Sequence, residues 1–432
     1  MPKITFLGAG STIFAKNVLG DCMLTPALRD AQLALYDIDQ SRLRTSELIL
    51  NNINKNCNQD RAKIVAYTDR EKALKDANYV INAVQVGGYQ PCTVIDFEIP
   101  KKYGLRQTIG DTIGIGGIFR ALRTIPVLLD FAGDMEELCP EAWFLNYTNP
   151  MAILTGIMLR SSYIKTVGLC HSVQVCVPTL LQGLGINSDN IQWKIAGINH
   201  MAWLLEITKE QQDLYPEIKK RALQRSKDHD DLVRYEIMKQ FGYYVTESSE
   251  HNAEYFPYFI KDKYPELIER FKIPLDEYPR RCVEQIKDWE KTKENLLNNQ
   301  ELTHQRTLEY ASYIMEAIET DQPYQIGGNV LNTDLIPNLP QKACVEVPCL
   351  VDGKGITPTF VGELPPQLAA LNQTNINVHL LTIEAALTRK KEHIYHAAML
   401  DPHTSAELSL DQIKALCDEL IEAHGDWLPA FK

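Results

Sequence analysis

KITFLGAGSTIFAKNVLGDCMLTPALRDAQLALYD, residues 3–37, holds two short β-rich runs on either side of a helical stretch. The first run ends at Gly8 and the second run ends at Asp37. Gly8, Gly10 and Ser11 stand where the first strand would meet the helix. Glycine there lets the backbone approach a pyrophosphate, and the helix N-terminus offers N–H groups to bind it. The stretch therefore predicts the first βαβ unit of a dinucleotide-binding sheet.

Asp37 indicates which dinucleotide this unit would hold. A carboxylate at the end of the second strand accepts hydrogen bonds from ribose hydroxyls and repels a 2′-phosphate, which favours NAD over NADP. The usual third glycine of the fingerprint would fall at Ile13, so the glycine pattern is incomplete. The alternative is that Asp37 only caps a helix that begins near Asp39 and Ser41.

The alternation of strand and helix continues beyond this unit. Helical stretches separate further strand-like runs at residues 63–67, 78–84, 142–147 and 166–169. A β-α-β alternation of this kind predicts a doubly wound parallel sheet. We therefore expect an α/β protein whose first domain, residues 1–195, is Rossmann-like and binds NAD.

The remaining residues, 196–432, mix strands and helices without that alternation. Residues 193–206 predict a strand, a turn and a second strand, and residues 344–351 and 356–361 predict two more strands. Long helical stretches are expected at residues 214–241, 283–320 and 374–399. This half is predicted to be an α+β substrate domain, so that the whole chain has the architecture of lactate and malate dehydrogenases.

The composition excludes several classes of partner. The 432 residues carry a formal net charge of −12 at pH 7, which disfavours nucleic acids and anionic membrane surfaces. No apolar run approaches the roughly 18 residues that span a bilayer, and the opening run is too short for a signal peptide. We therefore expect a cytoplasmic protein. Its ten cysteines form no CxxC pair, so most are expected to be free, buried thiols.

Two residues that follow predicted strands or lie in turns have metal-binding side chains. Cys170 follows the strand at 166–169, and His200 lies in the turn within 193–206. A thiolate and a neutral imidazole suit a borderline divalent ion, and two protein ligands leave positions open for substrate oxygens. Such a pair, far apart in the chain, also occurs without any metal, so the pattern alone leaves both interpretations open.

Other polar residues stand where the predicted sheet would open. Asn149 closes a strand and would either hold a substrate group or form an ordinary turn. Asp111 lies in a glycine-rich loop, which suits either a mobile active-site loop or a solvated one. Residues 246–255 combine three acids with a histidine and a tyrosine, a density that suits acid–base catalysis or a capped helix start. Arg280–Arg281 would bind an anion or pair with acids such as Glu277.

Together these residues resemble glycoside hydrolase family 4, a family of NAD- and metal-dependent glycosidases. The resemblance covers the whole chain and rests on the segments Phe6–Ser11, Asp37–Asp39, Val86–Gly88, Asn149–Pro150, Gly168–Ser172 and Ala196–His200. The α-galactosidase branch is the most similar, on the segments Ile198–Ala202, Val245–His251 and Gln373–Val378. The resemblance implies α-galactosides of the melibiose or raffinose type as substrates, and a homodimer or homotetramer.

The resemblance also implies the reaction. NAD would oxidise the sugar C3 hydroxyl, a base would remove the C2 proton, and the glycosidic bond would break by elimination; water would then add and the hydride would return. Cys170 and His200 would hold Mn²⁺ against the C2 and C3 oxygens. Tyr255 would be the C2 base, and Asn149 would bind substrate hydroxyls.

The acid that protonates the leaving group stays open. The phospho-α-glucosidase branch has an aspartate after the metal-binding cysteine, where this chain has His171. His171, Asp111 or a carboxylate within residues 247–254 would supply the proton. The same departure favours an unphosphorylated sugar, although Arg280–Arg281 keeps a phosphosugar as a weaker alternative.

Four other functions are alternatives. An α-glucosidase or an α-galacturonidase of the same family would share these residues. An NAD-dependent 2-hydroxy acid dehydrogenase would share the nucleotide half, but it would need no Mn²⁺ and would release NADH. A non-catalytic NAD-sensing regulator would need neither a metal nor a base, so Cys170, His200 and Tyr255 argue against it.

Overall fold

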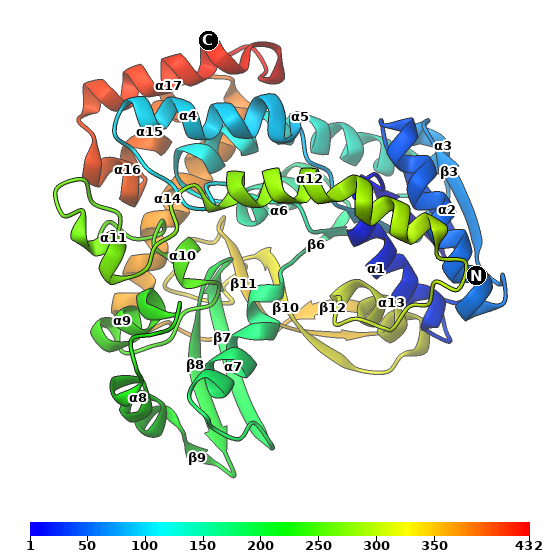
Figure 1. The fold of residues 1–432 in the computed structure, drawn as a ribbon, viewed down its shortest axis with the longest axis horizontal. Coiled ribbons are helices and arrows are strands. Elements are labelled where there is room, and N and C mark those ends of the chain that lie inside the picture. Colours follow the sequence, from blue (N-terminus) through cyan, green and yellow to red (C-terminus); the bar gives the residue numbers. More distant parts are fainter.

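The computed structural model describes residues 1–432, and its strands form one sheet (Figure 1). The strands are β1 (Lys3–Leu7), β2 (Gln32–Tyr36), β3 (Lys63–Tyr67), β4 (Tyr79–Asn82), β5 (Trp143–Asn146), β6 (Lys165–Leu169), β7 (Ile191–Ile198), β8 (Met201–Lys209), β9 (Gln212–Asp213), β10 (Tyr324–Leu331), β11 (Cys344–Asp352) and β12 (Gly355–Pro358). Their order is β3-β2-β1-β4-β5-β6-β10-β11-β7-β8-β9, and β12 pairs with β11 beside this path.

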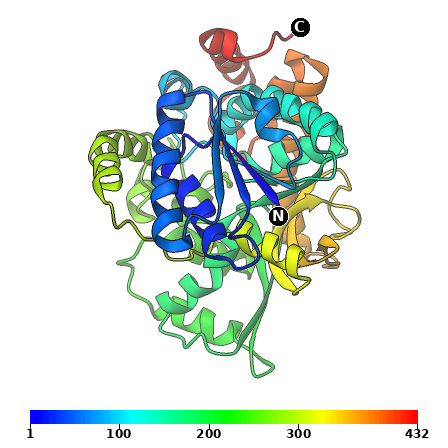
Figure 2. The same ribbon diagram turned by 90° about the vertical axis from the view of Figure 1, so that its right-hand side faces the viewer.

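Strands β1 to β6 confirm the predicted Rossmann-like half. All their pairings are parallel, and the order 3-2-1-4-5-6 is that of dinucleotide-binding folds. Ile4, Val80 and Leu145 are fully buried in these strands. Such strands are apolar along their length because helices cover both faces of a parallel sheet. Figure 2 faces this half of the molecule, whose first strands and helices are blue.

The C-terminal half extends the same sheet with antiparallel strands. β10 pairs with the end of β6, and β11 joins β10 to the β7–β8 hairpin. The strand, turn and strand predicted at 193–206 are thereby confirmed, with His200 in the turn. Because β10 and β11 insert between β6 and β7, the sheet is continuous across residue 195. One hydrophobic core likewise reaches from Ile4 to Leu428, and the division of the chain at residue 195 stays a prediction.

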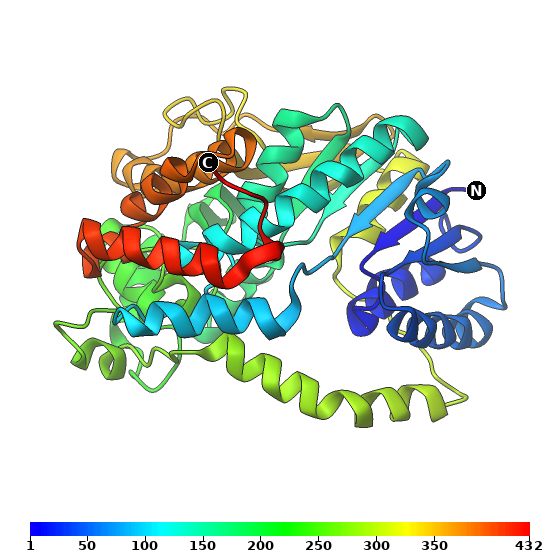
Figure 3. The same cartoon turned by 90° about the horizontal axis from the view of Figure 1, so that it is seen from above.

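Helices cover both halves of the sheet. The first half carries α1 (Thr12–Leu24), α2 (Gln40–Asn58), α3 (Arg70–Leu74), a π-helix (Gly88–Thr93), α4 (Val94–Lys102), α5 (Gly114–Leu138), α6 (Met151–Ser161) and α7 (His171–Gly183). The second carries α8 (Tyr215–Gln224), α9 (Leu232–Phe241), α10 (Ser249–Asn252), α11 (Glu266–Arg270), α12 (Glu277–Asn298), α13 (Tyr310–Thr320), α14 (Pro366–Thr388), α15 (Lys391–Leu400), α16 (Pro402–Glu407), α17 (Leu410–His424) and a 3-10 turn (Gly425–Trp427). Figure 3 shows the last long helix, α17, beside α4 of the first half. None of these helices has both the length and the apolar character of a membrane span.

The three long helical stretches expected from the sequence are each interrupted. Residues 214–241 form α8 and α9, since polar side chains between them bond to nearby backbone N–H groups and compete with the helix. Residues 283–320 form the end of α12 and α13, and the carboxylate of Asp21 on α1 holds the loop between them. Residues 374–399 form α14 and α15, which are separated at Arg389, where φ is 59°.

Candidate active site

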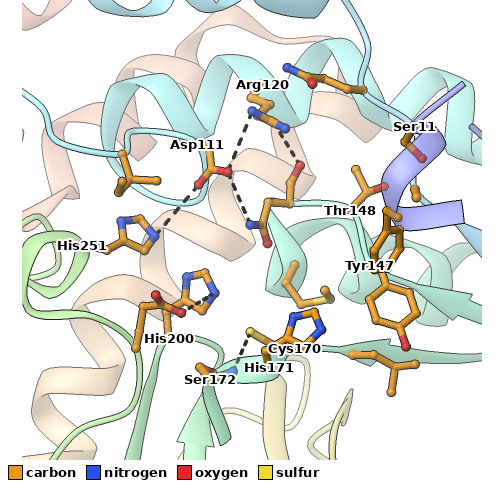
Figure 4. A pocket seen from close by; sticks show the side chains of 18 of the residues that line it. Ser11, Asp111, Arg120, Tyr147, Thr148, Cys170, His171, Ser172, His200 and His251 are labelled. Atoms are coloured by element: carbon orange, nitrogen blue, oxygen red, sulfur yellow. Dashed lines mark hydrogen bonds and ion pairs between the residues drawn. The ribbon is translucent and has the colours of Figure 1, made fainter. Parts of the chain in front are cut away.

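A cavity of about 490 Å³ opens at the carboxyl ends of β1, β4, β5 and β6 (Figure 4). Ligands of open α/β sheets bind at this edge. Six of the residues predicted from the sequence line the cavity: Ser11, Asp111, Asn149, Cys170, His171 and His200. The other four predicted residues lie outside its lining: Gly8, Gly10, Asp37 and Tyr255.

Ser11 of the turn between β1 and α1 lines the nucleotide end of the cavity, and the rest of the turn lies behind it. Gly8 has a φ of 88°, and a Cβ there would lie 2.7 Å from the carbonyl oxygen of Ala83, so glycine is required. The N–H of Gly10 donates to the Oδ2 of Asp37 at 2.6 Å, which fixes the carboxylate at the end of β2. The hydroxyl of Ser11 donates to the carbonyl of Gly8 at 2.7 Å. The four predicted nucleotide residues are thus in one place.

The metal end is assembled from three separate segments. Cys170 directly follows β6 and is the N-cap of α7, where its sulfur accepts a hydrogen bond from the N–H of Ser172 at 3.5 Å. His200 occupies the β7–β8 turn, with a φ of 63° and a side chain that is only 6% exposed. Glu247 joins this pair, and one ligand atom from each of Cys170, His200 and Glu247 lies within 4.8 Å of the others. From the sequence, Glu247 was predicted only as one of several candidate acids.

The charges of this cluster favour a bound cation. Burial alone would lower the pKa of His200, but the negative charges of Glu247 and Cys170 outweigh it and raise that pKa to about 10. Burial would likewise raise the pKa of Glu247, yet the positive charge of His200 lowers it to about 2. A thiolate, an imidazole and a carboxylate around one point form a donor set that fits a divalent ion.

Asp111 is held inside the cavity by four groups, of which the Thr112 hydroxyl is nearest and donates to Asp111 Oδ1 at 2.6 Å. Asn149 donates its Nδ2 to Asp111 Oδ2 at 3.4 Å, and Arg120 Nη1 lies 3.9 Å from the same oxygen. His251 Nε2 is 4.0 Å from Asp111 Oδ1. Burial would raise the pKa of Asp111, but the charges of Arg120 and His251 lower it below the usual value. Asp111 is therefore suited to accept hydrogen bonds as an anion.

Glu254 fixes the loop that carries Asp111, a role that sequence analysis did not identify. Its carboxylate accepts the backbone N–H groups of Thr108 at 2.7 Å, Ile109 at 3.2 Å and Gly110 at 3.1 Å. It also bonds to Nδ1 of His251 at 2.8 Å. Burial would raise the pKa of Glu254, but the hydrogen bond from His251 and those N–H groups keep it low. No sequence pattern signals a carboxylate that binds three distant N–H groups.

Tyr255 lies behind the cavity wall. Its ring packs edge-on against His251 and His200, with ring centroids 5.2 and 6.3 Å apart, respectively. The hydroxyl is buried and makes no hydrogen bond. Burial first, and then the charges of Glu247 and Asp111, raise the pKa of Tyr255 well above its usual value. A positive charge in the metal end is therefore needed before this phenol can give up its proton.

His171 and the predicted arginine pair have carboxylate partners. The Nε2 of His171, whose side chain is half exposed, lies 2.7 Å from Glu309 Oε2, and this hydrogen bond raises the pKa of His171. Arg280 and Arg281 both donate to Glu277. Arg281 lines the cavity, but it also donates to Glu250 at 2.5 Å. The arginine pair is thus neutralised by acids of the protein itself, which is the second of the two alternatives that the sequence left open.

Comparison with known proteins gives the wider context of this site. The family model "Family 4 glycosyl hydrolase" matches residues 3–186, and "Family 4 glycosyl hydrolase C-terminal domain" matches residues 195–404. An α-galactosidase of Bacillus subtilis (strain 168) is 67% identical over 433 residues and 100% of both chains. The 6-phospho-β-glucosidase of Thermotoga maritima, solved with manganese, NAD⁺ and glucose-6-phosphate, has a TM-score of 0.81 at 23% identity over 99% of this chain and 100% of that one. A Plasmodium falciparum malate dehydrogenase has a TM-score of 0.51 at 14% identity over 90% and 99%, respectively, so the dehydrogenase-like fold is confirmed.

Proposed function

The chain belongs to family 4 of the glycosyl hydrolases, and we propose that this glycoside hydrolase acts on α-galactosides of the melibiose or raffinose type, with bound NAD and Mn²⁺. The 67% identical relative from Bacillus subtilis is named an α-galactosidase. The more distant Thermotoga maritima enzyme was solved with manganese and NAD⁺. The donor set of the metal end and the glycine turn of the nucleotide end support the same two cofactors here.

The observation that carries the substrate class is the lack of a free cation in the cavity. Arg281 is neutralised by Glu277 and Glu250, and Arg120 donates to the hydroxyl of Tyr278 and faces Asp111. No lysine lines the cavity. A phosphate or carboxylate on the sugar would find no arginine or lysine free to pair with it and would lose its hydration on entry. An uncharged sugar is therefore favoured over a 6-phosphosugar or a galacturonide.

The chain's own residues would hold both cofactors. When bound, NAD would supply a reversible hydride acceptor for the sugar C3, and Mn²⁺ would supply a Lewis acid for the oxygens on C2 and C3. Asp37 would accept the ribose hydroxyls, and its orientation by the N–H groups of Gly10 and Asp39 supports this role. Cys170 and His200 would hold the ion.

Proton transfers would be divided between the two sides of the cavity. Tyr255 would remove the C2 proton once C3 is a ketone, because that ketone acidifies C2 and the buried hydroxyl has no other partner. This role requires the hydroxyl to reach the sugar past His200 and His251, which separate it from the cavity. The electron pair left on C2 would form a C1–C2 double bond as the C1–oxygen bond breaks, and His171 would protonate the leaving oxygen; water would then add to C1. His171 suits this role because its half-exposed ring borders the cavity. Asp111, with its anionic carboxylate, and Asn149 would accept and donate hydrogen bonds to sugar hydroxyls.

The test is hydrolysis of p-nitrophenyl α-galactoside with NAD⁺, Mn²⁺ and a thiol reductant, and then with each one omitted. We expect hydrolysis that needs both cofactors and leaves no NADH in solution. The α-glucoside, α-galacturonide and 6-phospho-α-galactoside, measured in parallel, should be poorer substrates. Faster turnover of a charged sugar would contradict the substrate assignment. NADH accumulation with a 2-hydroxy acid and no hydrolysis would instead indicate a dehydrogenase.

A further inference from the structure

Glu247 is positioned by β8, although it lies outside every strand. Val245 forms an isolated antiparallel bridge with Trp203 of β8, and the N–H of Thr246 donates to the carbonyl of Ala202 at 2.9 Å. These contacts clamp the segment along the strand that leaves the His200 turn. Glu247 comes next in the chain, so its side chain is delivered to the same end of the hairpin as His200.

The backbone at this point is held in an unusual conformation. Glu247 has a φ of 68°, and His200, which it faces, has a φ of 63°. Residues other than glycine adopt this left-handed region infrequently, because the Cβ crowds the backbone there. Strain of this kind persists where the surrounding structure imposes it, and it gathers at functional sites. At these two positions the side chains face each other, with Glu247 Oε2 3.3 Å from His200 Nε2.

The carboxylate of Glu247 offers one oxygen to that point. Its Oε1 accepts the N–H of Ser248 at 3.0 Å, which fixes the orientation of the group. Its Oε2 lies 3.3 Å from Nε2 of His200, and the Cys170 sulfur lies within 4.8 Å of both partners' ligand atoms. The Glu247 side chain is 24% exposed, so the point remains open toward the cavity.

We propose that Glu247 is a third protein ligand of the divalent ion, which makes the metal end a Cys–His–Glu site. The inference rests on the proposed function, which assigns the ion to Cys170 and His200. Thiolate and imidazole alone suit zinc or copper, whereas carboxylate oxygen is the ligand type that suits Mn²⁺. Two anionic ligands also balance the charge of a divalent ion. The site should therefore hold Mn²⁺ before NAD or sugar arrives and still leave positions for two sugar oxygens.

The first experiment titrates the metal-free full-length protein with Mn²⁺ alone and follows the free ion by electron paramagnetic resonance. Glu247→Gln should weaken Mn²⁺ binding by at least about 100-fold, because a direct ligand contributes at least as much as the outer-shell partners, whose loss costs about 10- to 100-fold. Glu250→Gln is the matched control, since it removes a nearby charge in the same segment that contacts Arg281 instead. Its Mn²⁺ affinity should change by no more than about threefold. Equal losses in the two variants would overturn the proposal.

The second experiment separates direct binding from an effect of charge. At saturating Mn²⁺, pulsed resonance in deuterated water counts the exchangeable waters around the ion. Glu247→Ala should show one water more than the wild type, because water would take the vacated position. An unchanged count, in a variant whose NAD binding shows that it is folded, would mean that Glu247 acts only from a distance.

These readouts need no sugar, so they can be distinguished from a test of the proposed function. A wild type that binds Mn²⁺ through Glu247 but cleaves no α-galactoside would refute the substrate and leave this inference standing. A wild type that cleaves α-galactoside while the Glu247 variants keep their Mn²⁺ affinity would refute this inference alone. Failure of the wild type to bind Mn²⁺ would also refute the inference that Glu247 is a metal ligand.

Discussion

The two ends of the active-site cavity lie at one edge of the sheet but are built in different ways. The nucleotide end comes from a single βαβ unit, and its central contact joins the N–H of Gly10 to Asp37. The metal end takes Cys170, His200 and Glu247 from three segments that are far apart in the chain. A local motif therefore fixes one end, whereas the other depends on how the C-terminal strands extend the sheet.

The same difference applies to charge. At the nucleotide end, the N–H groups of residues 8–11 already donate to the protein itself, so the N-terminus of α1 provides the positive potential that a pyrophosphate needs. At the metal end, negative side chains are concentrated enough to raise the pKa of His200 to about 10. Each end thus attracts a ligand of opposite sign, and substitutions at one end should leave binding at the other end intact. The following predictions test that independence.

The largest effect is expected for Cys170→Ser. It removes a thiolate from the metal end, so the stabilisation of several kcal/mol that a Lewis acid supplies should be lost. Hydrolysis of p-nitrophenyl α-galactoside should fall by about 10⁴-fold. NAD affinity, measured by calorimetry, should stay within about twofold, since the variant leaves the β1–α1 turn untouched. A parallel loss of NAD affinity would show that the two ends are not independent.

Tyr255→Phe should lower kcat by about 10³-fold, the usual contribution of a general base. Affinities for Mn²⁺ and NAD should not change, because the hydroxyl makes no hydrogen bond that the variant would break. Exchange of the C2 proton with deuterated solvent should be lost in proportion to kcat.

Tyr258→Phe is the matched control, since Tyr258 is 49% exposed and makes no hydrogen bond through its side chain. Its kcat should equal that of the wild type. A kcat for Tyr255→Phe close to the wild-type value would remove Tyr255 from the proton transfer.

The two ends also differ in how far sequence reasoning reaches. Gly8, Gly10 and Asp37 could be predicted as nucleotide-binding residues because a tight turn after the first strand and an acid at the end of the second are visible in one short stretch of sequence. Residue type marked His200, but the left-handed backbone of His200 and Glu247 has no signature in either residue. It arises from the pairing of β8 with the 245–246 segment, which is a long-range contact.

Breaks within helices and contacts between distant residues also could not be predicted from the sequence. The break within 214–241 depends on hydrogen bonds between side chains and backbone, which leave the helical apolar pattern intact. Glu309 lies far along the chain from His171, and only the fold brings them together. Periodicity therefore predicts the existence of helices and strands, whereas partners between segments have to be found in the structure.

Helix α14 supports the hairpin that carries His200. Asn372 of α14 accepts a hydrogen bond from Trp203 and donates one to the carbonyl of Met201, which anchors the hairpin that carries His200.

His379 on the same helix is buried, and burial lowers its pKa from 6.5 to about 4. The folded state thus keeps His379 neutral while the unfolded chain takes up a proton below pH 6.5, so stability is complete above that pH and is lost as pH falls toward 4.

This loss amounts to about 3 kcal/mol at the acid limit. Chemical denaturation between about pH 7.5 and about pH 4.5 should show that the wild type loses that much more stability than His379→Gln, because the glutamine does not titrate. Near the upper pH, the unfolding free energies of the two proteins should differ only by a constant that does not depend on pH. Equal pH dependence of the two proteins would show that His379 is protonated in the folded state.

The smallest effect is expected for Asp37→Ala, which tests independence from the nucleotide side. The change removes the acceptor of the Gly10 N–H and the carboxylate that would bind the ribose, so NAD affinity should fall by about tenfold, the value of one charged hydrogen bond. Mn²⁺ affinity should be unchanged, and saturating NAD should restore the wild-type kcat. Unchanged NAD affinity would reduce Asp37 to a structural partner of the β1–α1 turn. A fall in Mn²⁺ affinity would instead mean that the turn and the metal end form one cooperative site, since a residue of the first unit would then control ligands held by the extended sheet.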